Sequence, residues 1–350
     1  MSGLAMAVLL ACAAVAGAGP ARGPEVWLFP APWPGNGRGL RQMVAREDEW
    51  PRARSLADGI GYWPWLLDAW SSDDDLRAFF AAVKRWDLRL GLEVPVVKAP
   101  AWGGDARPLD ARRAFEQWRA QWERFRRCGM GRVDAFSFDE PVYAARHVIP
   151  AQEPPGALPD APDRPTAATP ARERIAYAAR ETAAFVQTLR KEHPRARVGD
   201  IEPYPALTLA EIQEAVDAIQ RECRRRGVRG LDFVRIDPDW SLMGAGGQGS
   251  WVEMKRLETW CRQRNLSFSI IVWAAQNPRL PEERRADNGT WLAGLLAQGE
   301  AMRRAGVRPD QIVIESWLHV PDEAVPESLP GTFTHSVVEY ARAFGLRPRR

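Results

Sequence analysis

The sequence predicts a single-domain α/β protein of the (β/α)₈ TIM-barrel class. Between residues 25 and 345 of the 350-residue chain, eight short strand-like runs alternate with amphipathic helical segments. That number of strands and that length are typical of this barrel. A doubly wound open sheet is the main rival, and the absence of a Gly-rich phosphate loop after the first strand favours the barrel over it. No linker divides the chain, so we expect one domain over residues 25–345.

The strands are predicted from short apolar runs, rich in β-branched and aromatic residues, that end at polar or acidic turns. They lie at Glu25–Ala31, Asp58–Trp63, Leu88–Val97, Asp134–Asp139, Arg197–Ile201, Leu231–Ile236, Leu266–Trp273 and Gln311–Glu315.

The intervening helices are predicted from apolar residues spaced three and four apart. Gly129, Gly227 and Gly306 stand where a helix ends in a left-handed residue. The helical segments lie at Asp75–Trp86, Asp110–Arg127, Ala171–Lys191, Leu209–Arg226, Trp251–Arg264 and Thr290–Ala305.

The first 18 residues predict a secretory signal. The run Leu4–Ala18 is apolar and uncharged, and Ala16-Gly17-Ala18 resembles a cleavage site. Leu10-Ala11-Cys12 also loosely resembles a bacterial lipoprotein box. We therefore expect a secreted or periplasmic protein, either free or anchored as a lipoprotein. The alternative is a cytoplasmic protein whose first residues form a disordered leader.

Composition limits the partners. The chain has 48 basic and 45 acidic side chains, a net charge of +3, which argues against a nucleic-acid partner. No stretch after the leader is long and apolar enough to span a membrane. The three remaining cysteines, Cys128, Cys223 and Cys261, form neither a disulfide framework nor a zinc signature. We expect a monomer without a membrane span, cofactor or catalytic zinc.

Residues 141–170, after the fourth strand, form the longest segment predicted to be irregular. They contain eight prolines. Long loops in compact domains are often functional, and a loop at this place overhangs the carboxyl-terminal face of a barrel. We expect it to form a wall or lid of the site.

Carboxylates end four of the last five predicted strands. They are Asp139 and Glu140 after strand four, Glu202 after strand five, Asp237 after strand six and Glu315 at the end of strand eight. Barrel active sites lie at these strand ends. Each acid could instead cap a helix or turn. Aromatic side chains accompany them at Trp63, Tyr204, Trp240, Trp273 and Trp317.

Carboxylates and indoles on one rim are typical of glycoside cleavage. One carboxylic acid protonates the leaving oxygen, and a second acts as nucleophile or activates water. Clustered carboxylates repel, which keeps one of them protonated near neutral pH. Flat indoles, of which this chain has 16, can stack on pyranose rings. The substrate we expect is a polysaccharide or oligosaccharide.

Asp139-Glu140-Pro141 resembles the Asn-Glu-Pro motif at the end of strand four in clan A glycoside hydrolases. This resemblance, to a bacterial glycoside-hydrolase-type barrel, implies that Glu140 is the proton donor. The clan places its nucleophile Glu on strand seven, whereas Trp273–Asn277 contains no carboxylate. The partner of Glu140 is therefore chosen by position: Glu202 on the neighbouring strand first, Asp237 next.

The sequence thus predicts an exported glycosidase with Glu140, Glu202 and Asp237 as catalytic residues. Two other readings stay open: a barrel that binds glycans without cleaving them, and a metal-dependent enzyme that uses rim carboxylates as ligands. The expected substrate-binding residues are Asp139, Trp63, Tyr204, Trp240, Trp273, Glu315 and Trp317.

Overall fold

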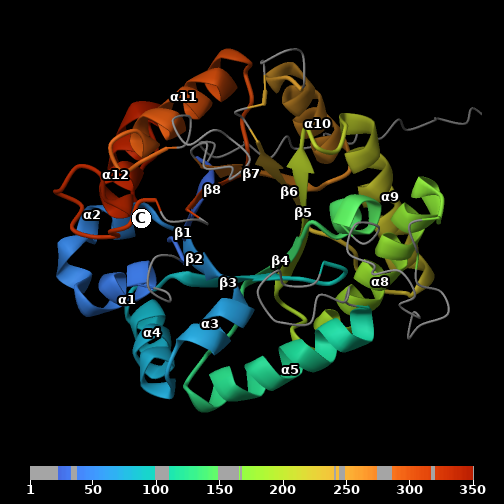
Figure 1. Cartoon of the computed structure of the whole chain (residues 1–350), viewed down its shortest axis with the longest axis horizontal. Coiled ribbons are helices and arrows are strands. Elements are labelled where there is room, and N and C mark those ends of the chain that lie inside the picture. Colours follow the sequence, from blue (N-terminus) through green and yellow to red (C-terminus); the bar gives the residue numbers. More distant parts are fainter. Residues whose placement is uncertain are drawn as a thin grey trace, which may run out of the picture.

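A closed barrel of eight parallel strands forms the centre of the computed structural model, and helices surround it (Figure 1). Each strand pairs with the next, and β8 pairs with β1, which closes the barrel. The TIM-barrel prediction is confirmed. The strands are β1 (Glu25–Phe29), β2 (Gly59–Tyr62), β3 (Arg89–Val94), β4 (Ala135–Asp139), β5 (Arg197–Tyr204), β6 (Phe233–Pro238), β7 (Ser267–Val272) and β8 (Gln311–Glu315).

The structure describes residues 23–32, 38–98, 110–148, 165, 168–239, 242–243, 249–273, 286–316 and 320–349. The leader, Trp240, Trp317 and most of the Pro-rich segment lie outside these residues. Within them, no helix has the length and apolar character needed to cross a bilayer.

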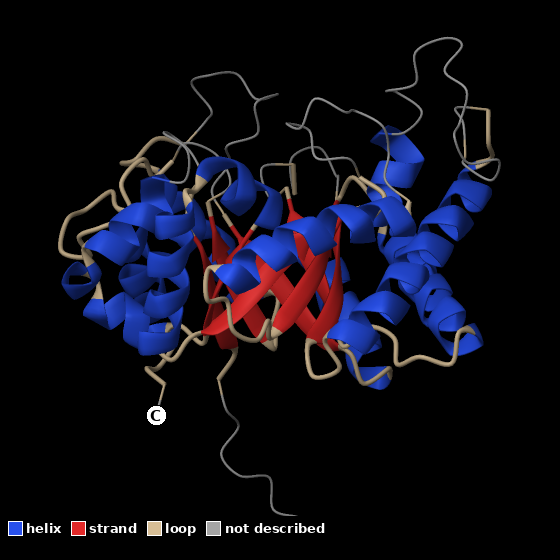
Figure 2. Ribbon diagram, turned by 90° about the horizontal axis from the view of Figure 1, so that it is seen from below, coloured by secondary structure: helices blue, strands red, loops and turns tan. Residues whose placement is uncertain are grey.

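The helices pack around the outside of the strands, as the side view shows (Figure 2). Seven of them were not among the helical segments predicted above: α1, η1, α2, α3, α6, η2 and α12. The helices are α1 (Arg38–Ala45), η1 (Glu47–Glu49), α2 (Pro51–Leu56), α3 (Pro64–Trp70), α4 (Asp73–Arg85), α5 (Ala111–Arg127), α6 (Pro141–Tyr143), η2 (Ala144–Val148), α8 (Ala171–Glu192), α9 (Leu209–Arg225), α10 (Trp251–Gln263), α11 (Trp291–Arg304) and α12 (Phe333–Phe344).

Local sequence signals set the helix ends. Ser72 and Thr208 begin α4 and α9 with capping boxes, in which the hydroxyl accepts the N–H three residues on. The three glycines predicted to end helices, Gly129, Gly227 and Gly306, have φ values of 90°, 66° and 69°. These glycines adopt the left-handed conformation at little cost because they lack a Cβ.

An aspartate repeats before every second strand. The carboxylates of Asp58, Asp134, Asp232 and Asp310 each directly precede an even-numbered strand and accept a backbone N–H from the odd-numbered strand before it, at 2.8–3.1 Å. Their backbone groups also bond to both neighbouring strands. The four aspartates therefore fix the amino-terminal ends of the strands.

Polar side chains close the amino-terminal end of the barrel. Glu25 accepts hydrogen bonds from Arg89 at 2.9 Å, Arg197 at 3.0 Å and Gln311 at 2.8 Å, and Arg197 also donates to Ser267 at 3.0 Å. Each partner comes from a different strand. These bonds cross-link the side chains inside the barrel and close its amino-terminal end. A ligand can therefore approach along the barrel axis from the carboxyl-terminal end.

Large aromatic rings fill the lumen next to glycines. A Cβ at Gly59 would overlap Trp27, one at Gly61 would overlap Phe29, and one at Gly199 would overlap the ring of Phe233. These rings occupy the space that side chains on β2 and β5 would otherwise need. The lumen is thus a packed core below the rim.

Two predictions required adjustment. The first eight residues of the segment predicted to be irregular, Pro141–Val148, are helical, because Pro is well suited to the first turn of a helix. The β5 strand also runs three residues beyond its predicted end, to Tyr204.

The cysteines Cys128, Cys223 and Cys261 are buried free thiols.

Gly61→Ala should lower the free energy of unfolding by about 1–3 kcal/mol, because the added methyl group overlaps the buried Phe29 ring. Urea denaturation measures the change. Gly131→Ala is the matched control, since no atom lies within 4 Å of a Cβ at that exposed position. Equal stability of the two variants would contradict the packing described here.

Candidate active site

The lumen-facing side of the strands can be assigned from one buried arginine. Arg235 on β6 donates to Ser137 on β4 at 3.2 Å and to Ser269 on β7 at 3.0 Å, across the interior. Side chains alternate along a strand. Asp139 and Asp237, two residues beyond Ser137 and Arg235, therefore face the same interior at the carboxyl-terminal rim.

Lys98, just beyond β3, joins two of the predicted site residues. Its Nζ lies 2.9 Å from Oδ1 of Asp139 and 2.8 Å from Oε2 of Glu140. Burial opposes the charged form of Lys98, but attraction to the two carboxylates outweighs it and holds the pKa of Lys98 well above its usual value. Lys98 is therefore cationic at neutral pH. For Glu140, burial and the charge of Asp139 outweigh the effect of Lys98, so the pKa of Glu140 lies above its usual value.

Glu140 occupies an unusual backbone conformation between β4 and α6. Its φ and ψ are 47° and 49°, in the left-handed region, which is costly for a residue with a Cβ. Its N–H donates to the carbonyl of Ile201 on β5 at 3.1 Å, and its carbonyl accepts from Ala144 at 2.9 Å. In a continuing strand, the side chain after Asp139 would point outward. The left-handed turn instead lets the Glu140 side chain reach Lys98 beside Asp139.

Glu202 faces the other side of the sheet. Gly199 on β5 faces the lumen, because a Cβ there would overlap Phe233. Side chains alternate along the strand, so Asp200 and Glu202 point outward. It is fully buried, and its two oxygens accept the backbone N–H groups of Val142 at 2.8 Å and Tyr143 at 3.1 Å. Glu202 therefore caps the helical segment that follows Glu140.

Burial is the main influence on both outward-facing acids of β5. It raises the pKa of Asp200 and of Glu202 well above their usual values, and the charge of Asp200 adds to the shift of Glu202. Neither oxygen of Asp200 has a hydrogen-bond partner among the described residues. The structure gives no physical reason for an acid at that position.

Asp237 lies at the rim without a direct cation. Its Oδ1 accepts the indole N–H of Trp273 at 2.6 Å. Burial, and then the charge of Glu140, raise the pKa of Asp237 to about 7, whereas the Trp273 hydrogen bond and Lys98 act against the shift. A substantial fraction of Asp237 is therefore protonated at neutral pH.

Glu93 and Glu315 lie deeper in the same region. Glu93 on β3 accepts the indole N–H of Trp63 at 2.7 Å, and burial followed by the charge of Asp139 raises its pKa to about 8. Burial also raises the pKa of Glu315, with further contributions from Glu93 and Asp237, against the opposing charge of Arg235. One oxygen of each glutamate is buried with no hydrogen-bond partner among the described residues.

The aromatic residues predicted to bind substrate differ in position. Trp63 and Trp273 are nearly buried, and each donates its indole N–H to a rim carboxylate. Tyr204 is buried on the outward side of β5, where its hydroxyl bonds to Ser250 and Glu253. Trp240 and Trp317 lie outside the described residues.

Sequence reasoning missed Glu93, Lys98 and Arg235. Glu93 and Arg235 had a detectable signal, since each is a charged residue inside an otherwise apolar strand. Lys98 lies one residue beyond the predicted end of strand three, and its contact with strand four depends on the barrel register. No linear spacing predicts that contact.

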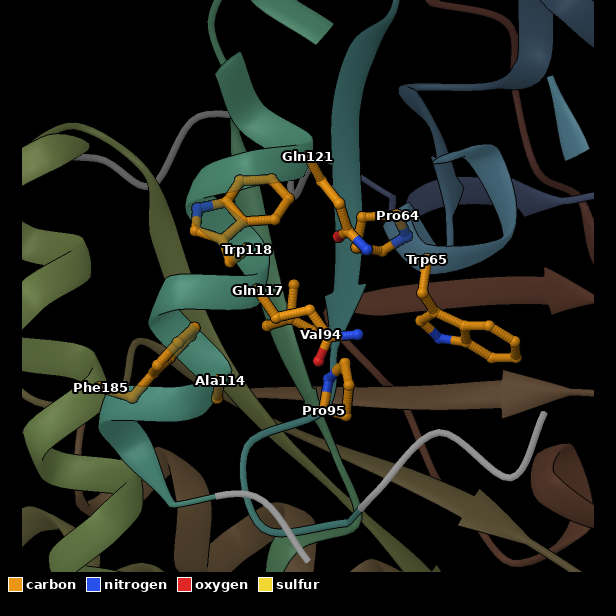
Figure 3. A pocket seen from close by; sticks show the side chains of 9 residues that line it. All are labelled: Pro64, Trp65, Val94, Pro95, Ala114, Gln117, Trp118, Gln121 and Phe185. Atoms are coloured by element: carbon orange, nitrogen blue, oxygen red, sulfur yellow. The ribbon is translucent and has the colours of Figure 1, made fainter. Parts of the chain in front are cut away.

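Two cavities lie outside the barrel. The one in Figure 3, between the end of β3 and helices α3, α5 and α8, has a volume of about 10 Å³ and fits about one water molecule. The other, of about 570 Å³, lies among α1, α3 and α4. Neither is lined by a rim carboxylate, so neither belongs to the candidate site. Among the described residues, no His, Cys, Asp and Glu side chains form a group of three suited to a metal ion.

The chain was compared with known proteins. No protein-family model and no curated sequence matches it. A β-glycosidase from Pyrococcus horikoshii is 11% identical, with 93% of this chain and 94% of that chain covered and a TM-score of 0.45. An endo-1,4-β-xylanase from Penicillium canescens is 11% identical, with 92% and 93% covered and a TM-score of 0.47.

A xylose isomerase domain protein from Alicyclobacillus acidocaldarius is 16% identical, with 93% and 99% covered and a TM-score of 0.43. These neighbours have different activities at low identity. They do not select a function, which has to be argued from the site itself.

The carboxyl groups of Glu140 and Asp237 differ in their nearest partners. Glu140 lies against the Lys98 cation, whereas Asp237 is half-buried and, among the described residues, accepts its hydrogen bond from a neutral indole. Opposite environments of this kind separate the pKa values of paired acids and define an acid and a base.

Glu93→Gln should make stability less sensitive to pH. Folding raises the pKa of Glu93 from 4.5 to about 8, so the folded protein binds this proton more tightly than the unfolded chain. The free energy of unfolding then falls as pH rises between those values, by up to about 1.4 kcal/mol per pH unit for one group. The variant, which keeps an acceptor for Trp63, should lose this contribution.

Urea unfolding at pH 5, 6, 7 and 8 measures the effect. Glu123→Gln, which removes an exposed carboxyl from α5, is the control and should leave the wild-type pH dependence intact. An unchanged pH dependence in Glu93→Gln would show that Glu93 is already ionised in the folded protein.

Proposed function

We propose that this protein is a glycoside hydrolase in which Asp237 is the proton donor and Glu140 is the ionised partner. The observation that carries the proposal is the unequal environment of the two carboxyls. Lys98 lies 2.8 Å from Glu140, whereas the contact of Asp237 is with a neutral indole N–H at 2.6 Å. A pair of acids with these unequal environments is what glycoside cleavage needs.

In this mechanism, Asp237 transfers its proton to the glycosidic oxygen as the bond to the sugar carbon breaks. Glu140 either attacks that carbon or removes a proton from the water that does so. Lys98 favours the ionised form of Glu140 against the opposing effect of burial, and the Trp273 hydrogen bond holds Asp237 in place. These roles exchange those that the Asp139-Glu140-Pro141 resemblance implies, because Lys98 adjoins Glu140 and not Asp237.

The proposed substrate is a polysaccharide or oligosaccharide, and the proposed setting is outside the cytoplasm. Support for the substrate class comes from the carboxylates together with the indoles of Trp63 and Trp273 at the rim. Support for export comes from the apolar run Leu4–Ala18, which ends in the small residues Ala16-Gly17-Ala18.

Glu140→Gln and Asp237→Asn should each lower kcat by at least about 10³-fold, because each removes one of the two proton-transfer or nucleophilic roles. Reducing-end release from a panel of polysaccharides measures this. In the wild type, activity should fall as pH rises through about 7, the pKa of Asp237. Retained activity in either variant would remove that residue from the mechanism.

Glu202→Gln is the control that separates catalysis from positioning. It keeps one carbonyl acceptor for the helix that follows Glu140, so kcat should fall by no more than about tenfold. The loss of one of the two hydrogen bonds should lower stability by about 0.5–1.5 kcal/mol. A loss of activity as large as that of Glu140→Gln, in a folded protein, would return Glu202 to the catalytic pair.

A further inference from the structure

The described rim carries more acids than cations. Five carboxyl groups, those of Glu93, Asp139, Glu140, Asp237 and Glu315, accompany two cations, Lys98 and Arg235. Lys98 pairs with Asp139 and Glu140, which leaves the other three acids with Arg235. A cation bound beside these acids would favour their ionised forms, which burial alone disfavours.

Arg235 does not satisfy the two deeper glutamates. Its hydrogen bonds go to the hydroxyls of Ser137 and Ser269. Glu93 and Glu315 are only 6% and 5% exposed, and Oε2 of each has no hydrogen-bond partner among the described residues. Buried acceptors without a donor are costly, so the structure holds two unused acceptor atoms on the lumen side of this rim.

The lumen position of both glutamates follows from the alternation of side chains. Glu93 lies two residues beyond Gly91, where a Cβ would meet Trp27 in the lumen. Glu315 ends β8, and the groups that act on it electrostatically, Glu93, Asp237 and Arg235, all face the same interior. The two unused oxygens therefore belong to the same chamber as the proposed acid, Asp237.

We propose that the substrate is an amino sugar with a free, protonated amine, and that Glu315 and Glu93 receive its ammonium group. This inference rests on the proposed glycosidase function and adds the substrate class to it. An ammonium group offers three N–H donors and one positive charge, which matches unused carboxylate oxygens and an excess of acids. A hydroxyl group supplies a donor but no charge.

The walls of the chamber favour an organic cation over a bare metal ion. The indoles of Trp63 and Trp273 lie beside the acids and hydrogen-bond to them. Aromatic rings attract ammonium groups through their faces, whereas calcium and magnesium need a shell of oxygen ligands.

The test uses β-1,4-linked tetramers that differ only at carbon 2: ammonium in the glucosamine tetramer, acetamide in its N-acetylated form and hydroxyl in cellotetraose. The same three substituents on a galacto-configured backbone form a second series. For the full-length protein, kcat/KM is measured by reducing-end release and Kd by calorimetry, also with calcium or magnesium chloride as competitor.

We expect the ammonium form of at least one series to exceed both matched forms at least tenfold in kcat/KM or in affinity. Glu315→Gln should reduce that preference at least fivefold, while Glu123→Gln, which removes an exposed carboxyl, leaves it intact. A preference that falls as salt is added would support a charge-based contact.

Each contrary result has a separate meaning. Cleavage of the acetamide or hydroxyl forms at equal or higher kcat/KM would overturn the amino-sugar inference and leave the glycosidase proposal standing. Selective binding of the ammonium form without cleavage would support the ammonium site and contradict the glycosidase proposal. Competition by the divalent ion would show that the cation received is a metal, and absence of all binding would overturn both.

Discussion

The ion pair of Lys98 with Asp139 and Glu140 is the interaction on which the rest of the rim depends. It places one cation between two carboxylates that would otherwise repel, at 2.9 and 2.8 Å. Removing a partner from a buried ion pair is strongly destabilising, because an uncompensated charge remains. With Lys98 committed to these two acids, Asp237, Glu93 and Glu315 are left with little positive charge beside them, and burial raises the pKa of each. One contact thus separates two acids that share a cation from three acids that do not contact it.

The neighbouring strand holds that arrangement in place. Glu140 adopts a left-handed conformation, and β5 supports it twice: the carbonyl of Ile201 accepts its N–H, and Glu202 caps the helix that begins at Pro141. The strained residue is therefore fixed by its surroundings, as expected where strain serves a function. Glu202, which the sequence suggested as a catalytic partner, thus holds the helix that follows Glu140.

Much of the fold was predictable, because it depends on local patterns that repeat. The alternation of apolar runs and amphipathic helices predicted all eight strands, and Gly129, Gly227 and Gly306 marked helix ends. The grouping of Asp139 and Asp237 at one rim also follows from their places at strand ends. The inward or outward direction of Glu202 was not predictable, because the predicted strand ended at Ile201 and a turn there leaves the direction open. The contact of Lys98 with Asp139 and Glu140 was also not predictable, because it depends on how strands three and four are staggered in the barrel.

The most direct test of the account is the titration of Asp237 itself, which needs no substrate. Carbon-13 NMR of protein labelled at the aspartate carboxyl carbons, compared with Asp237→Asn, identifies its resonance, and a pH series gives its pKa. The account predicts a midpoint of about 7 for Asp237, which moves downward in Glu140→Gln because the neighbouring negative charge is lost. A midpoint near the ordinary aspartate value of 3.8 would contradict the proposal that Asp237 holds the catalytic proton.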